Sequence, residues 1–210
     1  MSLANNPAFI QALKTVENNL QAAKRRGTYK EVQGEWRWFP DKSPEGGLPT
    51  LAYGHKLSPE EWSSKRISFN DPNTGELSSK DFRYGITDAQ AEALLKKDVS
   101  EKEAIAKRDW DHYQGTNPNT KQLDHPWESL KVGYQMLLVD KQFNTKSGLV
   151  KDGKWVWKTM AAKMKAGDDA GAVNASVAQW TDPNGVTRKL TTRAIEIAKA
   201  AGLPWEQLKP

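Results

Sequence analysis

The carboxylates of this 210-residue chain are the side chains best suited to chemistry. The chain has no cysteine and only three scattered histidines, and it carries no glycine-rich phosphate loop, zinc-binding histidine pair or nucleophilic serine elbow. Thiol chemistry and thiolate metal sites are therefore excluded, and we expect no metal and no cofactor. A pair of carboxyl groups can cleave a glycosidic bond, because one protonates the leaving oxygen while the other supports the sugar cation or activates water.

Glu17 is the first candidate for the acid of such a pair. It lies at the edge of an apolar stripe at helical spacing, formed by Phe9, Leu13, Val16 and Leu20. Partly apolar surroundings raise the pKa of a carboxyl group, which suits a general acid. A glutamate beside such a stripe is more often a solvated helix residue, so the assignment requires a second element elsewhere in the chain.

That second element is the segment 45–55, E-G-G-L-P-T-L-A-Y-G-H, in which paired glycines permit a tight turn before a strand-like run. Its end, T-L-A-Y-G-H at 50–55, resembles the T-I-G-Y-G-H signature of phage-type lysozymes (endolysins), with leucine and alanine in place of isoleucine and glycine. Two further blocks are similar to that family in the same order: G-I-T, A-E, L-L and D-V within 85–99, and W, G-V, L, R and E within 180–196.

The resemblance implies a muramidase without metal or cofactor that hydrolyses the β-1,4 bond between N-acetylmuramic acid and N-acetylglucosamine in bacterial peptidoglycan. It also implies an α+β, lysozyme-like fold in one catalytic domain over residues 1–210. We expect a small antiparallel β-lobe at about 28–57 and a helical lobe at about 86–205, completed by the first helix at 6–26. The alternatives are a lytic transglycosylase acting on the same bond and a non-catalytic wall-binding virion protein.

The resemblance assigns catalytic roles to particular residues by their positions in the motifs. Glu17 matches the general acid and Thr50 the threonine that holds the attacking water, although they lie further apart than the family pattern has them. The position of the family's second carboxylate is a proline here, flanked by Asp41 and Glu45; we favour Glu45, and Asp41 stays open. Glu35 is the alternative acid, but its glycine and tryptophan neighbours are typical of a ribbon.

Other positions are expected to support the site. His55 resembles the family's histidine, with Asp98 as its ion-pair partner, and we interpret this pair as structural. Trp38 is a candidate for stacking on a sugar ring, with core packing as the competing interpretation. By analogy with the family, Asn144 and Thr191 are candidates for polar contacts with the substrate.

The elements that must position these residues follow from caps and periodicity. Ser58, followed by proline, predicts the start of a short helix, and Thr87 opens a capping box for a long one that continues toward Trp110. Residues 34–53 predict a small ribbon, the only sheet expected, and 69–83 an exposed polar insertion. Further helices are predicted at 127–143, 156–165, 168–179 and 187–201.

The net charge of +5 favours approach to a polyanion such as a bacterial envelope. No nucleic-acid-binding motif accompanies the scattered basic residues, and no apolar run reaches the roughly eighteen residues of a membrane span. We therefore expect peptidoglycan as the partner, no nucleic acid, no membrane insertion and a monomer. The expected location is the host bacterial cytoplasm, with access to the wall through a separate pore protein, or a virion.

Overall fold

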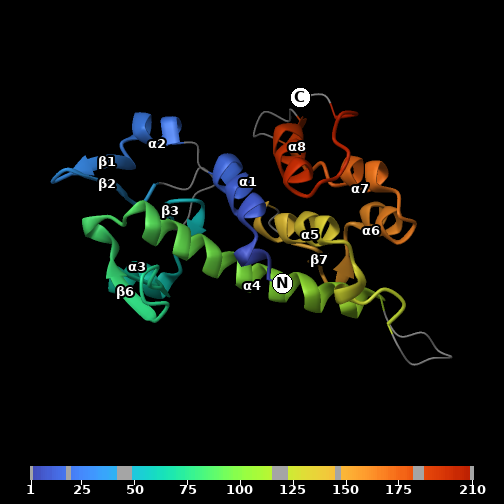
Figure 1. The fold of residues 1–210 in the computed structure, drawn as a ribbon, viewed down its shortest axis with the longest axis horizontal. Helices are drawn as coiled ribbons and strands as arrows, with labels where there is room; N and C mark the ends of the chain where they lie inside the picture. The colour runs from blue at the N-terminus through green and yellow to red at the C-terminus, as the bar shows by residue number, and fades with distance from the viewer. Residues whose placement is uncertain are drawn as a thin grey trace. The chain divides into compact units, whose positions relative to one another are not determined.

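The structure is a computed structural model that describes residues 2–17, 20–41, 49–114, 123–144, 148–181 and 187–208. The chain divides into two compact units. The ribbon unit comprises Leu13–Val99, and the helical unit comprises Met1–Ala12 with Ser100–Pro210. Two helices, α1 (Pro7–Glu17) and α4 (Asp88–Gln114), contribute residues to both units, and α4 is drawn in green as one continuous helix in Figure 1.

The ribbon unit is built from three two-stranded antiparallel hairpins and short helices. In chain order its elements after α1 are α2 (Leu20–Arg26), β1 (Tyr29–Val32), β2 (Glu35–Trp38), β3 (Thr50–Leu51), β4 (His55–Lys56), α3 (Pro59–Ser64), β5 (Arg66–Asn70), β6 (Leu77–Asp81) and the 3-10 turn η2 (Phe82–Tyr84). The first turn of α4 follows Thr87, whose side chain accepts from the Gln90 amide while the Gln90 side chain accepts from the Thr87 amide. The predicted capping box of α4 is confirmed.

The core of the ribbon unit is centred on Trp38. Its indole is fully buried and packs against the rings of Tyr29 and Tyr53, at centroid distances of 4.6 and 5.0 Å. The Trp38 Nε1 and the Tyr29 hydroxyl donate to the two carboxylate oxygens of Asp88, at 2.7 and 2.8 Å. Asp88 is the first residue of α4, so this carboxylate ties the β1–β2 hairpin to the start of that helix.

Two sequence predictions in this unit are wrong. The helix expected at 6–26 is described as α1 and α2, on either side of residues 18–19, which lie outside the described residues; Leu20, expected on its buried stripe, is 44% exposed. The segment expected as an exposed insertion begins inside the β5–β6 hairpin, where Ile67 and Phe69 are both buried. The alternation of apolar and polar residues along β5 explains this burial, because successive side chains of a strand face opposite sides.

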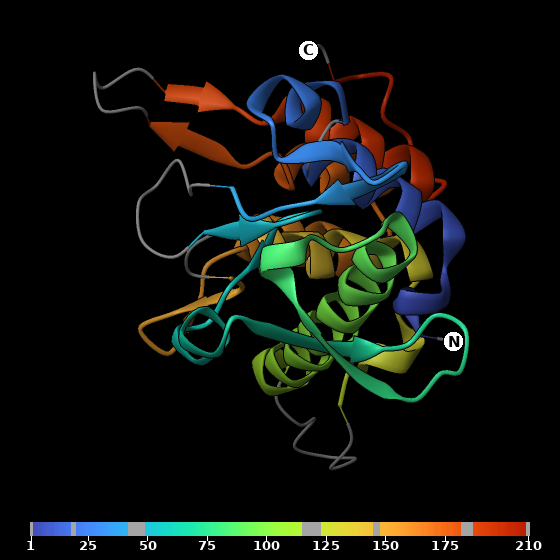
Figure 2. The same ribbon diagram turned by 90° about the vertical axis from the view of Figure 1, so that its left-hand side faces the viewer.

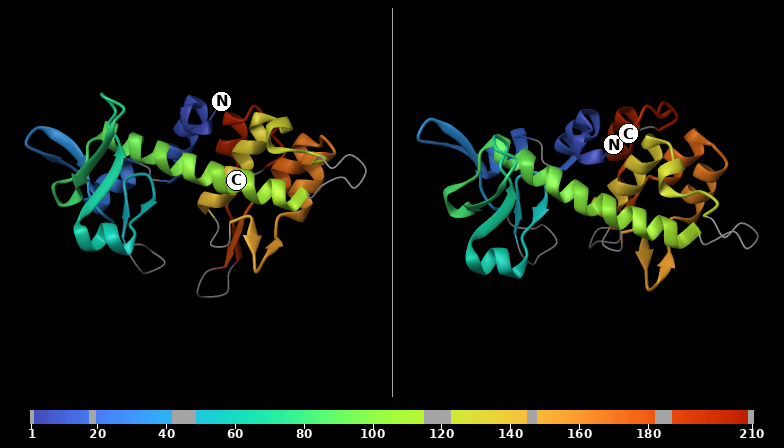
Figure 3. Two further views of the ribbon diagram at one scale, coloured as in Figure 1. Left: turned by 90° about the horizontal axis from the view of Figure 1, so that it is seen from below. Right: turned by 60° about the horizontal axis from the view of Figure 1, so that its bottom comes forward.

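The helical unit contains α5 (Val132–Asn144), whose residues Tyr134, Leu137 and Leu138 are buried. Its other elements are η1 (Leu3–Asn5), the rest of α4, η3 (Trp127–Ser129), β7 (Val150–Lys151), β8 (Lys154–Trp155), α6 (Lys158–Lys165), α7 (Asp169–Ala175), β9 (Gln179–Thr181), β10 (Thr187–Lys189) and α8 (Thr191–Ala200). Figure 2 shows β9 and β10 as paired orange arrows, and Figure 3 shows β7 and β8 as a second pair. These two hairpins were not predicted, and β9 and β10 occupy ends of segments expected to be helical.

The predicted α+β class is confirmed: helices dominate, and the strands form small antiparallel pairs. The prediction of a single small sheet is wrong, because the described residues contain five two-stranded sheets. Within the described ranges, each helix is too short or too polar to cross a lipid bilayer.

Candidate functional site

The carboxylate of Glu17 lies against the turn between β3 and β4. Glu17 is half-buried at the end of α1, and a methyl group placed on Gly54 would lie only 2.9 Å from Glu17 Oε2. Gly54 also has a φ of +86°, a conformation in which a side chain is strained. The lack of a side chain at Gly54 therefore lets the T-L-A-Y-G-H turn approach the Glu17 carboxylate closely.

Thr50 and Asp41 lie opposite each other in the same unit. The Asp41 amide donates to the Thr50 carbonyl at 2.7 Å, and the Thr50 amide donates back to the Asp41 carbonyl at 2.9 Å. Thr50 also pairs with Lys56 across the β3–β4 hairpin. The Asp41 carboxylate is held by Arg26, whose Nε lies 2.5 Å from Oδ2. Two of the four predicted catalytic residues are thus neighbours through backbone hydrogen bonds.

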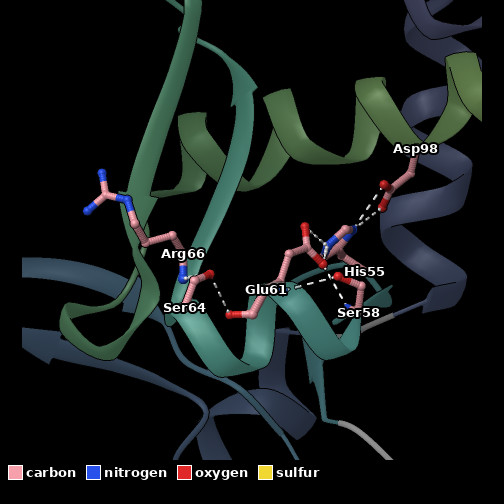
Figure 4. Close-up of polar contacts among 6 residues, drawn as sticks. All are labelled: His55, Ser58, Glu61, Ser64, Arg66 and Asp98. Atoms are coloured by element: carbon pink, nitrogen blue, oxygen red, sulfur yellow. Dashed lines mark hydrogen bonds and ion pairs between the residues drawn. The ribbon is translucent and has the colours of Figure 1, made fainter.

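His55 begins β4 and is held between two carboxylates (Figure 4). Its Nδ1 lies 3.0 Å from both carboxylate oxygens of Asp98 on α4, and its Nε2 lies 3.2 Å from both of Glu61 on α3. The imidazole is buried, as is most of Asp98. The predicted pairing of His55 with Asp98 is confirmed, and Glu61 adds a second partner. We call His55, Glu61 and Asp98 the histidine clamp.

Glu61 also caps the start of α3. Its Oε2 accepts from the Ser58 amide at 2.8 Å, and the Glu61 amide donates to Ser58 Oγ at 3.1 Å. These reciprocal bonds form a capping box, with Pro59 in the first turn. The Ser58 cap predicted from the sequence is confirmed. The same carboxylate therefore fixes the start of α3 and contacts the first residue of β4.

The clamp favours the charged form of the imidazole. Burial of His55 lowers its pKa, but hydrogen bonds and charge attraction from Asp98 and Glu61 outweigh that effect and raise the pKa above its ordinary value. An imidazolium donates from both ring nitrogens, which matches a carboxylate on each side. The clamp is therefore an ionic connection between β4, α3 and α4 that is complete when His55 is protonated.

The other predicted site residues have different outcomes. Trp38 is fully buried, so its indole has no surface for a sugar ring, and the prediction that it stacks on substrate is wrong. Glu45 and the side chain of Asn144 lie outside the described residues, and their roles stay predictions. Thr191 is the half-buried first residue of α8. Asn144 and Thr191 belong to the helical unit, whereas Glu17, Asp41 and Thr50 belong to the ribbon unit.

The alternative acid, Glu35, lies in a setting unlike that of Glu17. It is exposed at the start of β2 and pairs with Arg37 two residues away, at 2.6 Å. Its cross-strand partner is Val32, next to the turn of the β1–β2 hairpin. Glu35 therefore lacks the partly buried surroundings that suit a general acid, and its position favours Glu17.

Sequence reasoning missed Glu61 as part of this site. The prediction of this helix start used only Ser58 and the proline after it, although a glutamate three residues after a serine is also typical of a capping box. Its contact with His55 depends on how α3 folds back after β4, which local patterns do not specify. In the described part of the chain, no group of histidine and carboxylate side chains is placed to hold a metal ion.

Comparisons with protein families, with curated proteins and with solved structures find no match for this chain. The functional argument therefore depends on the residues and their geometry.

Proposed function

We propose that this chain hydrolyses the glycan of bacterial peptidoglycan, at the β-1,4 bond between N-acetylmuramic acid and N-acetylglucosamine. The observation that carries the proposal is the approach of Gly54 to the Glu17 carboxylate, 2.9 Å from Oε2 to the position of an added methyl group. Glu17, to which the resemblance gives the role of the acid, and Gly54 of the lysozyme-like T-L-A-Y-G-H turn are 37 positions apart in the sequence, and they lie close together here.

The conformation of the turn supports the same proposal. Ala52 stands where the family signature has its first glycine, and its φ is +51°, in the left-handed region that glycine adopts freely and alanine rarely does. The next glycine of the signature, Gly54, also has a positive φ. The backbone thus keeps the shape that a two-glycine signature favours, even with alanine at the first position.

In the proposed reaction, Glu17 protonates the oxygen of the leaving sugar. A second carboxylate supports the positive charge that develops on the other sugar, and Thr50 helps to hold the water that attacks it. Asp41 is the described candidate for the second carboxylate because it pairs with Thr50 through the backbone. Glu45 is the other candidate. In the setting we propose, the enzyme is made in a host bacterial cytoplasm and reaches the wall through another protein's pore, or it is carried in a virion.

The test is the clearing of a suspension of outer-membrane-permeabilised cells by wild type, Glu17→Gln and Glu35→Gln. Loss of a general acid lowers the rate by roughly 100-fold or more, so Glu17→Gln should clear the suspension far more slowly than wild type. Glu35→Gln is the matched control, because it removes a carboxylate from the same unit at an exposed position, and it should behave as wild type.

Two results would contradict the proposal. Equal clearing by wild type and Glu17→Gln would exclude Glu17 as the acid. Clearing lost in Glu35→Gln but retained in Glu17→Gln would move the role to Glu35. If no version clears the cells, co-sedimentation with purified peptidoglycan decides whether the chain is a wall-binding protein.

A further inference from the structure

We propose that Glu61 is a positioning residue of this site, which acts through His55 to hold the β3–β4 hairpin against Glu17. The inference rests on the proposed function for its catalytic part. Its structural part, that Glu61 and Asp98 together hold a charged His55, stands on the geometry of the clamp.

The clamp joins three elements through one side chain. Asp98 approaches the imidazole from α4 and Glu61 approaches it from α3, each with both carboxylate oxygens within 3.2 Å of one ring nitrogen. A doubly protonated ring donates to both carboxylates. A neutral ring keeps one proton, so its other nitrogen becomes an acceptor that faces a carboxylate, and that contact is repulsive.

The clamp lies one residue away from the contact with Glu17. His55 directly follows Gly54, the glycine that lies against the Glu17 carboxylate, and its β4 neighbour Lys56 pairs with Thr50. A change at His55 is therefore transmitted through the backbone to both proposed catalytic positions. Proton transfer and water attack depend steeply on geometry, and a displacement of about 1 Å can cost roughly 100-fold in rate.

Two carboxylates determine the electrostatic environment of the His55 imidazole. In the described structure, Asp98 and Glu61 are the charged groups that act on its ring. The pocket that His55 and Asp98 line is completed by Tyr53 and by apolar side chains, Leu51 and Ala52 beside the β3–β4 turn and Ala91, Leu94 and Leu95 from α4. Burial raises the pKa of the Tyr53 hydroxyl, so Tyr53 stays neutral while His55 titrates. Removing the charge of one partner should therefore change the protonation of His55 without rearranging a wider network.

Glu61→Gln removes the charge that faces His55 and can keep the helix cap. Glutamine also serves as the third residue of a capping box, so its side-chain oxygen can still accept from the Ser58 amide, while the negative charge facing His55 is lost. Glu60→Gln is the matched control. Glu60 lies in the same first turn of α3 and is exposed, so both substitutions remove the same charge from the helix terminus.

The experiment measures the imidazole titration of His55 by NMR in the full chain, and the pH profile of peptidoglycan cleavage, for wild type, Glu61→Gln and Glu60→Gln. We expect the His55 midpoint to fall in Glu61→Gln and to stay at the wild-type value in Glu60→Gln. In Glu61→Gln, the alkaline limb of the activity profile should shift to lower pH by the same amount as the His55 midpoint. As the pH falls and His55 becomes protonated in each version, the activity of Glu61→Gln should approach that of wild type.

An unchanged His55 midpoint in Glu61→Gln would overturn the clamp whatever the activity does. A lowered midpoint with an unmoved activity profile would show that Glu61 does not position the site. If the wild type cleaves no peptidoglycan at any pH, the proposed function and the positioning role fail together, and the NMR midpoint still decides whether Glu61 holds His55.

Discussion

Among the described residues, each unit of the molecule buries a cluster of charged side chains, and these two clusters have opposite arrangements. In the helical unit, Asp140 lies between two cations: its Oδ1 accepts from Arg193 Nε at 2.7 Å, and its Oδ2 lies 2.8 Å from Lys141 Nζ. In the ribbon unit, His55 lies between the carboxylates of Glu61 and Asp98. One cluster surrounds an anion with cations, and the other surrounds a titratable cation with anions.

The two clusters differ in the group that titrates: a carboxylate in the helical unit and an imidazole in the ribbon unit. Lysine and arginine keep their charge at neutral pH, and Asp140 and Lys141 are almost completely buried. Burial raises the pKa of Asp140, but Lys141 and Arg193 outweigh it and the pKa is lowered. The Asp140 carboxylate therefore keeps its charge to a lower pH than an ordinary aspartate, whereas the histidine clamp loses its positive charge as the pH rises through the raised pKa of His55.

The largest expected effect is from Asp140→Ala. This substitution removes the buried carboxylate that Lys141 and Arg193 share, and breaking a buried ion pair in this way costs about 3–5 kcal/mol. The free energy of unfolding, measured by urea denaturation at pH 7, should fall by that order. Glu128→Ala, which breaks the exposed pair with Lys107, is the control and should change stability little. A loss in Asp140→Ala no larger than that in the control would contradict the importance of the helical cluster.

A pH-dependent effect is expected from His55→Asn. The folded-state pKa of His55 is raised, so its stabilisation is fully present below the unfolded pKa and is lost as the pH rises through the folded pKa. The substitution should therefore lower the melting temperature more at pH 5.5 than at pH 9. Equal losses at both pH values would show that the clamp contributes no ionic stabilisation.

The smallest effect is expected from Ser58→Ala. It removes the hydroxyl that accepts from the Glu61 amide but leaves the carboxylate that faces His55, and loss of such a cap costs about 1 kcal/mol. The loss of unfolding free energy should be the same at pH 5.5 and pH 9, because no titrating group is removed. A loss confined to low pH would mean that the cap and the clamp cannot be separated.

The parts of the molecule that local chemistry specifies could be predicted from the sequence. Ser58 before a proline, and Thr87 three residues before a glutamine, have the capping geometry that their side chains favour. The β-ribbon after the first helix and the α+β class also follow from local patterns. The pairing of His55 with Asp98 was found through the resemblance to lysozymes, because two residues 43 positions apart leave no local pattern.

The contacts that depend on tertiary packing could not be predicted in the same way. Glu61 had no role in the sequence prediction, and its contact with His55 follows only from the fold of α3. Asp140 and Lys141 are a charged pair within the apolar run of α5, a pattern that could have indicated a buried ion cluster. The burial of Phe69 was missed because the polar turn that follows β5 dominated the prediction for that segment.

The most direct test of the proposed function is mass spectrometry of the fragments released from purified peptidoglycan. Wild type should release fragments that end in reducing N-acetylmuramic acid, which shows that water was added across the β-1,4 bond, and Glu17→Gln should release almost none. Fragments that end in 1,6-anhydro-N-acetylmuramic acid would contradict hydrolysis and identify a lytic transglycosylase. Reducing fragments released equally by Glu17→Gln would contradict the role of Glu17.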